Sequence, residues 1–561
     1  MTARYAPAVA GDTLHEVLTN VGTAPGGMTF VGSGELPFAD LDARTAELAA
    51  HWAGLGVRPG DRVVLILPDS VEFMLALMSA ARAGVLPVPF FPPLTLAQRD
   101  PYIDTLRGVC RTAGARLCLG NEAVLDLIGG DALPCATDTF GALAAATPGP
   151  VGRPAPGDPA LLQFTSGSTS APKGVLVTNQ ALMDHARALG EAMDIHGEVD
   201  RGVSWLPLYH DMGLIGKVFA AVLTRTSTWH IPPTRFVRDP AGFLRLLTEV
   251  RGTISFAPNF AYGLMTRRVS LDGLDLSSWR LAGCGAEPVH APTLRRFAET
   301  YRPAGFRPEA FTPCYGLAEA TLAVCVTRPG AGLGTLTVDA ERLGTDRRVE
   351  LCAPGTPGST EIVSSGGQIP GTEVRIVDEH GVEVEDGTDG EVVTRSAHGG
   401  SEYYGNAAAT AATWRDGWLY TGDSGFLHDG QLYVTGRLKD LIIVNGRNYP
   451  PQDIERVVDQ VDNVRTNNVV AVGVRSGDGE AVHLVVETVR HKESAGLADR
   501  ISAAVRRSFP VPVAGVTVVR SGTLPRTSSG KVRRRHTAHL LAAGKLAALT
   551  EGHAMAEGTT T

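Results

Sequence analysis

The sequence Val63-Val-Leu-Ile-Leu-Pro68 is a short, continuous apolar run, which is typical of a strand buried on both faces of a sheet. Apolar residues then recur with the period of an α-helix, at Val71, Met74, Leu77, Met78 and Ala81, and Gly84 ends this pattern. A second extended run, Val85-Leu-Pro-Val-Pro-Phe90, follows at once. Strand, helix and strand at such short intervals predict an α/β layered fold with parallel pairing.

The same alternation returns further along the chain and changes near Gly436. Leu161-Leu-Gln-Phe164 and Gly174-Val-Leu-Val-Thr178 have the pattern of strands, and Thr178 or Asn179 can cap the helix that follows. After Gly436, strand-like runs lie at 469–474, 482–486 and 516–519. We therefore expect a large N-terminal α/β domain of several subdomains over residues 1–436, a small mobile α+β domain over 437–550, and a disordered tail over 551–561.

The composition of the 561-residue chain excludes several classes of protein. Apolar residues make up 43% and charged residues 20%, as in ordinary globular domains, and the net charge of −8 provides no basic field for nucleic acid or anionic lipid. The 7 cysteines are scattered, so we expect neither a disulfide framework nor a structural zinc site. Neither a secretory signal nor a membrane helix is recognisable, so we expect a cytoplasmic protein with no nucleic-acid or membrane partner.

The string Phe164-Thr-Ser-Gly-Ser-Thr-Ser-Ala-Pro-Lys-Gly174 has the composition of a phosphate-binding loop. It offers hydroxyl groups at Thr165, Ser166, Ser168 and Thr169, a close backbone approach at Gly167, and a cation at Lys173. It is not a Walker A motif, because Pro172 and Gly174 replace the second glycine and the Ser/Thr of that motif. A solvated linker is the alternative, but the position between two apolar strands favours phosphate binding.

Four further motifs follow in order: Tyr315-Gly-Leu-Ala-Glu319, Tyr420-Thr-Gly-Asp423, Gly436-Arg-Leu-Lys-Asp440 and Pro525-Arg-Thr-Ser-Ser-Gly-Lys531. Together with the loop, they resemble the adenylate-forming superfamily, which includes acyl-CoA synthetases, peptide-synthetase adenylation domains and luciferases. The resemblance implies that the chain uses ATP and Mg²⁺, and that a substrate carboxylate attacks the α-phosphate and expels pyrophosphate.

The resemblance assigns the catalytic role to Lys531, whose ammonium can bridge the attacking carboxylate and the α-phosphate. It assigns Glu319 to the magnesium ion, with Thr165 as a second ligand, and hard oxygen ligands suit this metal. The alternatives are that Lys531 is a solvated residue beginning the basic run Lys531-Val-Arg-Arg-Arg535, and that Glu319 is a surface helix residue.

The same resemblance supplies the nucleotide contacts. Asp423 is expected to accept hydrogen bonds from both ribose hydroxyls, and Arg437 to contact the ribose or a phosphate. The expected lining of the adenine site consists of the ring of Tyr315 and the small or adjacent residues Gly316, Gly285, Ala286 and Glu287. Core packing for Tyr315 and a turn for Asp423 are the alternatives.

Lys439 is the expected hinge of the small domain. Arg533, Arg534 and Arg535 are interpreted mainly as a solvated face, with docking of a carrier protein as the other option.

Narrower strings resemble fatty acyl-AMP ligases: Trp205-Leu-Pro-Leu-Tyr-His-Asp-Met-Gly-Leu-Ile-Gly216, Pro258-Asn-Phe-Ala-Tyr262, Leu276-Ser-Ser-Trp-Arg280, Cys314-Tyr-Gly-Leu-Ala-Glu-Ala-Thr-Leu322 and Asp440-Leu-Ile-Ile-Val-Asn-Gly-Arg-Asn-Tyr449. Such enzymes transfer a fatty acyl group to the phosphopantetheine arm of an acyl carrier protein, usually for a polyketide or peptide synthase. Their mark is an insertion late in the large domain, which we place around residues 332–365. The alternatives are an acyl-CoA ligase that uses free CoA, an enzyme that only forms the adenylate, and a non-catalytic nucleotide-binding regulator.

The acyl pocket is expected to include His210, Phe256 and Asn259, although His210 is equally compatible with a core position. The neighbouring Asp211 is interpreted as structural. Lys217 departs from the expected pattern, because it falls on an apolar segment where a small or apolar residue would line an acyl tunnel. One hypothesis is that Lys217 and Phe256 shorten this tunnel or add a polar contact. The other, which we favour, is that the lysine side chain extends to solvent.

Overall fold

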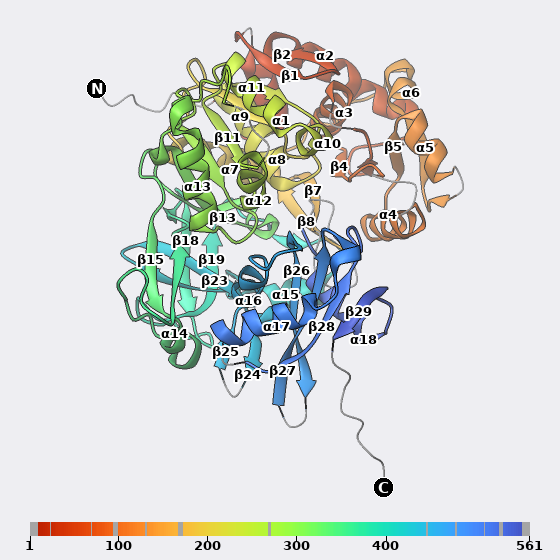
Figure 1. The fold of residues 1–561 in the computed structure, drawn as a ribbon. Coiled ribbons are helices and arrows are strands. Elements are labelled where there is room, and N and C mark those ends of the chain that lie inside the picture. Colours follow the sequence, from red (N-terminus) through yellow and green to blue (C-terminus); the bar gives the residue numbers. More distant parts are fainter. Residues whose placement is uncertain are drawn as a thin grey trace.

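The computed structural model describes residues 9–22, 24–68, 70–93, 99–129, 132–165, 172–267, 271–444, 447–476, 479–509, 511–526 and 531–552. Figure 1 shows a large body containing the elements up to β23, with the blue elements from β24 onward gathered against its lower edge in that view. We call the part before Arg437 the large domain and the part from Arg437 onward the small domain. The exact boundary stays a prediction.

The first sheet contains four strands in the order β4-β3-β5-β6. They are β3 (Arg62–Leu65), β4 (Leu86–Pro89), β5 (Leu117–Gly120) and β6 (Ala136–Thr139). β3 and β4 are parallel, which confirms the predicted strand–helix–strand unit, and α3 (Val71–Arg82) connects them. The hydroxyl of Ser70 caps this helix by accepting a hydrogen bond from the amide of Phe73. The flanking helices are α4 (Arg99–Ala113), α5 (Glu122–Ile128) and α6 (Phe140–Ala145).

A 9-stranded sheet in the order β17-β14-β13-β12-β11-β9-β10-β1-β2 forms the centre of the large domain. Its strands are β1 (Gly27–Phe30), β2 (Gly34–Pro37), β9 (Arg201–Ser204), β10 (Ser227–His230), β11 (Ile254–Ala257), β12 (Leu281–Cys284), β13 (Phe311–Gly316), β14 (Ala323–Val326) and β17 (Gly367–Gln368). The strands from β1 to β13 along this order pair in parallel. Their carboxyl ends therefore share one edge, where ligands bind in open α/β sheets.

Helices cover this sheet and bury its apolar side chains. They are α1 (Leu14–Val21), α2 (Phe38–His51), α7 (Asn179–Ala192), α8 (Asp211–Leu214), α9 (Ala220–Thr224), α10 (Pro233–Arg238), α11 (Pro240–Glu249), α12 (Asn259–Met265) and α13 (Ala291–Tyr301). Thr178 caps α7, as one of the two predicted alternatives required. The π-helical turn η4 (Ile215–Phe219) joins α8 to α9.

Two smaller sheets complete the nucleotide side of the large domain. The order of the first is β20-β8-β7, with β7 (Pro159–Thr165), β8 (Lys173–Thr178) and β20 (Glu402–Tyr403). Here β7 and β8 are antiparallel, so this unit does not repeat the parallel arrangement that the similar alternation suggested. The second contains β18 (Thr372–Val377), β19 (Gly390–Ser396), β21 (Trp414–Arg415), β22 (Trp418–His428) and β23 (Gln431–Arg437), and α15 (Ala407–Thr413) lies beside it.

The segment interpreted as an insertion forms its own small unit. It consists of β15 (Thr335–Asp339), α14 (Ala340–Asp346) and β16 (Ser359–Val363), and the two strands pair antiparallel. A Cβ atom at Gly344 would lie 2.9 Å from the carbonyl oxygen of Asn448, so α14 packs closely against the small domain. Figure 1 shows α14 and β25 near each other at the lower left of the view.

The small domain has separate hydrophobic cores, whose members all follow residue 441. Its hairpin is β24 (Ile442–Val444) and β25 (Arg447–Tyr449), and its main sheet has the order β26-β27-β28-β29. The remaining elements are β26 (Val464–Ser476), β27 (Gly479–Thr488), β28 (Val513–Val519), β29 (Ala548–Gly552), α16 (Pro451–Val458), α17 (Leu497–Ser508) and α18 (Arg534–Ala542). The three predicted strand runs fall within β26, β27 and β28. Within the described ranges, no helix is both long and apolar enough to cross a membrane.

Candidate functional site

The hairpin of β7 and β8 carries the described part of the phosphate loop. Thr165 at the end of β7 pairs with Lys173 at the start of β8. The predicted loop residues between them, Ser166, Gly167, Ser168 and Thr169, lie outside the described residues. The ammonium of Lys173 lies over the ring of Tyr403, with Nζ 4.5 Å from the ring centroid. This contact directs the lysine toward the strand β20, which pairs with β8.

Tyr403 also connects this hairpin to Glu319. Its hydroxyl donates a hydrogen bond of 2.7 Å to Oε1 of Glu319. Burial raises the pKa of Glu319, whereas the bond from Tyr403 and the charge of Arg437 act to lower it. The carboxylate of Glu319 is thus partly desolvated. Among the described residues, Tyr403 is the one side chain that donates a hydrogen bond to it. Sequence reasoning missed Tyr403, because nothing in Glu402-Tyr403-Tyr404 indicates that this strand pairs with β8.

A histidine pair supports the segment around Glu319. The amide of Ala323 donates to Nε2 of His185 at 3.0 Å, so the neutral ring carries its proton on Nδ1. That nitrogen lies 2.9 Å from Nδ1 of His398. The carbonyl of His398 in turn accepts a hydrogen bond of 2.7 Å from the hydroxyl of Thr321. These residues were not predicted, and they fix the backbone immediately after the proposed metal ligand.

Asp423 and Arg437 face each other across β22 and β23, whose register pairs them directly. Nε of Arg437 lies 2.8 Å from Oδ1 of Asp423, and the hydroxyl of Tyr315 donates to Oδ2 at 2.7 Å. Asp423 raises the pKa of Arg437, and burial together with the Asp423 charge raises the pKa of Tyr315 well above its usual range. The structure therefore brings the three predicted nucleotide residues into one hydrogen-bonded group.

The predicted adenine-site residues follow β12 and β13 at the edge of the sheet. A Cβ atom at Gly285 would lie 2.7 Å from Sγ of Cys314, and one at Gly316 would lie 1.9 Å from the carbonyl oxygen of Leu322, so neither position has room for a side chain. Ala286 adopts a φ of +66°, a left-handed conformation that is unfavourable for alanine and recurs at functional sites.

Glu287 completes this loop. Its Oε1 accepts a hydrogen bond of 2.7 Å from the amide of Phe260. Burial raises the pKa of Glu287, and the positive charges of Lys531 and Arg526 oppose that rise. Two basic side chains of the small domain therefore act on a carboxylate at the end of β12.

Lys531 lies among acidic groups of the large domain. Burial lowers its pKa, and the charge of Arg437 acts in the same direction. Three carboxylates oppose this effect, those of Asp211, Glu287 and Asp423. The small domain thus brings its lysine to the edge of the sheet that holds the nucleotide residues.

His210 and Asp211 follow β9 at the same edge. Nδ1 of His210 lies 2.6 Å from Oδ1 of Asp211. Burial acts to raise the pKa of Asp211, but the charges of His210 and Lys531 outweigh it and leave that pKa below its usual value. The interpretation of Asp211 as structural did not anticipate this coupling to Lys531.

The basic run after Lys531 is not the solvated face that we expected. Both terminal nitrogens of the Arg534 guanidinium are engaged: Nη2 lies 2.8 Å from Oε1 of Glu455, and Nη1 lies 3.2 Å from Oδ2 of Asp440. Arg535 pairs with the other oxygen of Asp440 at 3.4 Å. The predicted hinge residue Lys439 is exposed and immediately precedes Asp440. The interpretation as a solvated face is therefore wrong for Arg534 and Arg535, which fasten the Lys531 segment to the hinge.

Of the predicted acyl-pocket residues, Phe256 and Asn259 are buried, whereas His210 is partly exposed. Phe256 is 5% exposed, and its ring occupies the space over Gly283, where a Cβ atom would lie only 2.0 Å from it. Oδ1 of Asn259 accepts a hydrogen bond of 3.0 Å from the backbone amide of His290. The side-chain oxygen of Asn259 therefore already has a partner within the protein. The alternative that Lys217 extends to solvent is wrong, because the residue is only 5% exposed. Lining of an acyl pocket by His210, Phe256 and Asn259 stays a prediction.

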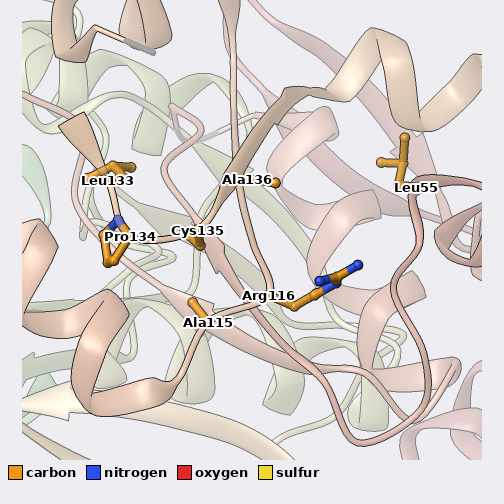
Figure 2. A pocket seen from close by; sticks show the side chains of 7 residues that line it. All are labelled: Leu55, Ala115, Arg116, Leu133, Pro134, Cys135 and Ala136. Atoms are coloured by element: carbon orange, nitrogen blue, oxygen red, sulfur yellow. The ribbon is translucent and has the colours of Figure 1, made fainter. Parts of the chain in front are cut away.

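A separate pocket of about 530 Å³ lies beside the first sheet. Figure 2 shows its lining residues, Leu55, Ala115, Arg116, Leu133, Pro134, Cys135 and Ala136. None of them belongs to the candidate site, so this pocket is distinct from the nucleotide and acyl regions.

Comparisons with known proteins agree with this geometry. The profile of the AMP-binding enzyme family matches residues 20–404, and the profile of the AMP domain of Disco-interacting protein 2-like proteins matches residues 439–551. The first match covers more than half of the chain, the interval between the two matches contains β22 and β23, and the second match begins at the predicted hinge residue Lys439.

Three curated relatives cover most of the chain. A putative acyl-CoA synthetase of Caulobacter vibrioides is 35% identical, over 89% of this chain and 89% of its own. A 4-hydroxyphenylalkanoate adenylyltransferase of Mycobacterium marinum is 33% identical, over 88% and 83%. A long-chain-fatty-acid–AMP ligase of the same organism is 33% identical, over 89% and 90%.

A solved structure from a study of fatty acyl-adenylate ligases of E. coli and L. pneumophila is similar throughout. It is 33% identical to this chain and superposes with a TM-score of 0.89. The superposition covers 95% of this chain and 98% of the solved one. The arrangement of both domains is therefore that of an adenylate-forming enzyme.

Proposed function

The chain belongs to the AMP-binding enzyme family, and from that premise we propose that it is a fatty acyl-AMP ligase that loads an acyl carrier protein. It uses ATP to convert a hydrophobic carboxylic acid into acyl-AMP and pyrophosphate. The acyl group then passes to the phosphopantetheine thiol of the carrier. The observation that carries this proposal is the position of Lys531 among the carboxylates of Asp211, Glu287 and Asp423.

In the first step, an oxygen of the substrate carboxylate attacks the α-phosphorus of ATP, and the bond from that phosphorus to the leaving pyrophosphate oxygen breaks. Two anions must approach each other, so the step requires positive charge between them. Lys531 is suited to this task, because the nearby carboxylates favour its charged form against the effect of burial. Asp423 would hold the ribose hydroxyls, and Arg437 would orient this carboxylate through the 2.8 Å contact.

Glu319 fits a magnesium ion. Its partly desolvated carboxylate would gain from a neighbouring cation, and magnesium is usually held by one or two carboxylates together with substrate phosphates. Thr165 at the end of β7 would supply a further oxygen. Once bound, the ion would neutralise developing charge on the phosphate oxygens. Tyr403 positions Glu319 for this task through its hydroxyl.

In the second step, the sulfur of the thiolate attacks the acyl carbon, a thioester forms, and the bond to the AMP oxygen breaks. We propose that the small domain moves about Lys439 between the steps, as conformational steps commonly separate half-reactions. The pairing of Asp440 with Arg534 and Arg535 supports this, because it ties the Lys531 segment rigidly to the residue that follows the hinge.

Free CoA is the alternative acceptor. One relative is described as a putative acyl-CoA synthetase, and this description supports CoA as an alternative. The packing of α14 against β25 supports the carrier, because it places the insertion beside the moving domain. An enzyme that only forms the adenylate is the third possibility.

The test supplies the chain with ATP, Mg²⁺ and a panel of acids, first by ATP–pyrophosphate exchange and then with either CoA or a phosphopantetheinylated carrier protein. We expect acid-dependent exchange and thioester formation on the carrier. Thioester formation on CoA at an equal or higher rate would overturn the proposed acceptor. Absence of exchange with every acid would overturn the enzyme assignment and favour a nucleotide-binding regulator.

A further inference from the structure

Lys217 is a buried cation on the acyl side of the candidate site. It lies on η4, the π-helical turn Ile215–Phe219, and is 5% exposed. π-Helical turns inside α-helices are frequent at functional sites. The neighbours of the lysine in this turn, Ile215, Val218 and Phe219, are at most 1% exposed and belong to the hydrophobic core. The side chain is thus built into the interior, where a charged group requires a partner.

The described residues supply Lys217 with an aromatic face and with no hydrogen bond or ion pair. Nζ lies 4.3 Å from the centroid of the Phe256 ring on β11. Phe256 is held in this position because its ring fills the space above Gly283 on the neighbouring strand β12. A cation–π contact compensates only part of the cost of burying an ammonium.

The nearest acidic groups do not neutralise this cation. The thiol of Cys314 is neutral near pH 7, because burial raises its pKa to about 12. The charge of Asp200 favours the ammonium form of Lys217, but Asp200 is already bound by Arg280 at 2.5 Å and by the hydroxyl of Thr253 at 2.7 Å. Burial therefore prevails and lowers the pKa of Lys217 to about 7.

His230 on β10 is a second polar group with an unmet bond. It is 4% exposed, its Nε2 lies 3.0 Å from the hydroxyl of Thr228, and its Nδ1 is buried without a hydrogen-bond partner among the described residues. Burial and the nearby charge of Lys217 lower its pKa to about 3. Lys217 and His230 are therefore close enough for the charge of one to affect the other, and among the described residues neither Nζ of Lys217 nor Nδ1 of His230 has a hydrogen-bond partner.

This polar pair lies beyond the reacting centre. The helix α8 begins at Asp211, next to His210, and runs directly into η4. Lys217 is seven residues from His210, which corresponds to roughly 10 Å along a helix axis. A substrate whose carboxylate lay near His210 would therefore extend along this helix toward Lys217.

We propose that Lys217 is a specificity-determining residue, and that the preferred acid carries a second oxygen group on its chain, which accepts a hydrogen bond from the Lys217 ammonium. This inference rests on the proposed acyl-AMP ligase function and names its substrate class. A carboxylate would be bound most strongly, because it would neutralise the buried cation, and a carbonyl or hydroxyl oxygen would be bound by the same ammonium more weakly.

The test measures kcat/KM for ATP–pyrophosphate exchange with matched acids of six, eight and twelve carbons. Each plain acid is compared with its ω-carboxy, ω-hydroxy and keto counterparts. We expect at least one oxygen-bearing acid to exceed its plain counterpart by 10-fold or more. Preference for the plain acid at every length would overturn the inference, and this outcome requires no variant.

Two variants identify the residue responsible. In Lys217→Met the preference should fall at least 10-fold, with exchange on plain acids retained or raised. In Lys217→Gln the preference for the carboxylate should be lost while that for a hydroxyl or keto oxygen is partly retained. Lys492→Met, at an exposed lysine of the small domain, is the control and should match the wild type. An unchanged preference in Lys217→Met would contradict the inference, whereas absence of exchange with all acids in the wild type would instead overturn the proposed function.

Discussion

The nucleotide side and the acyl side of the site treat buried charge in opposite ways. On the nucleotide side, Asp423 is bound by Arg437 and Tyr315, and Glu319 by Tyr403. On the acyl side, the described residues give Lys217 only an aromatic face. Internal pairing preorganises a site for a ligand that never changes, such as ATP, whereas an unpaired charge leaves recognition to the substrate. The difference indicates which half of the molecule determines specificity.

The largest effect is expected on the nucleotide side. Replacing Asp423 by alanine removes the partner of Arg437 and the acceptor of the Tyr315 hydroxyl, so we expect kcat/KM for ATP to fall at least about 100-fold, or about 3 kcal/mol. Exchange kinetics with varied ATP measure this. The control is Glu373→Gln, which breaks the exposed pair with Arg395 and should change kcat/KM for ATP by less than about 2-fold, because an exposed ion pair contributes little. Equal losses in both variants would remove the distinction between a functional and a surface pair.

The next effect concerns Tyr403, which sequence reasoning did not single out. In Tyr403→Phe the ring that faces Lys173 remains, and the hydroxyl that donates to Glu319 is lost. A hydrogen bond to a charged group contributes about 1.5–3 kcal/mol, so exchange should fall about 10- to 100-fold and the Mg²⁺ concentration for half-maximal rate should rise. A matched substitution, Tyr404→Phe, should leave the Mg²⁺ dependence unchanged. An unaltered Mg²⁺ dependence in Tyr403→Phe would separate this tyrosine from the metal site.

Buried His230 on the acyl side should lower the free energy of unfolding at acidic pH. The pKa of His230 is about 3 in the folded chain, below the unfolded value of about 6.5, so below pH 6.5 the unfolded chain binds more protons. The stability that the neutral ring provides is therefore complete above pH 6.5 and decreases as the pH falls, by about 2 kcal/mol at pH 5. Urea unfolding at pH 7.5 and pH 5 measures this difference. In His230→Gln, the difference in the free energy of unfolding between pH 7.5 and pH 5 should be about 2 kcal/mol smaller than in the wild type. If the variant lost as much stability at pH 5 as the wild type does, His230 would not be the group responsible.

The smallest effect is a change in the free energy of unfolding that should have opposite signs on the two sides of the site. Lys217→Met removes a buried, unpaired cation and keeps the volume of the side chain, so the free energy of unfolding at pH 7 should stay equal or rise by about 1 kcal/mol. On the nucleotide side, Asp423→Asn should lower it. Urea titrations of the two variants give the comparison. Destabilisation by Lys217→Met as large as that by Asp423→Asn would mean that Lys217 has an internal partner after all.

The sequence predicted the α/β layers and the chemistry on which short motifs depend. Val63 and Val85 begin runs that form parallel neighbours, because a strand buried on both faces has a recognisable pattern. Asp423 and Lys531 were found through motifs, and the structure brings them together. The motif could not reveal that Lys531 also interacts with Asp211, since that carboxylate lies more than 300 residues earlier.

Residues that depend on long-range pairing were missed or misread. Tyr403 reaches the site only because β20 pairs with β8 across more than 200 residues, and a short polar strand carries no such signal. Arg534 belongs to a basic run that is typical of a solvated surface, yet it finds Asp440 and Glu455 in the folded chain. Extension of Lys217 to solvent was the favoured interpretation and is wrong, because burial of a single lysine cannot be predicted from an apolar segment. In each case the tertiary environment determines the outcome.

The central claim is that Lys531 of the small domain completes the site for adenylation and not for transfer. The most direct measurement compares the two half-reactions in Lys531→Ala, using ATP with acid for the first and added acyl-AMP with the thiol acceptor for the second. We predict that adenylation falls at least about 100-fold while transfer from acyl-AMP stays within a few-fold of the wild type. Equal rates of adenylation in the variant and the wild type, or a parallel loss of both half-reactions, would contradict this account.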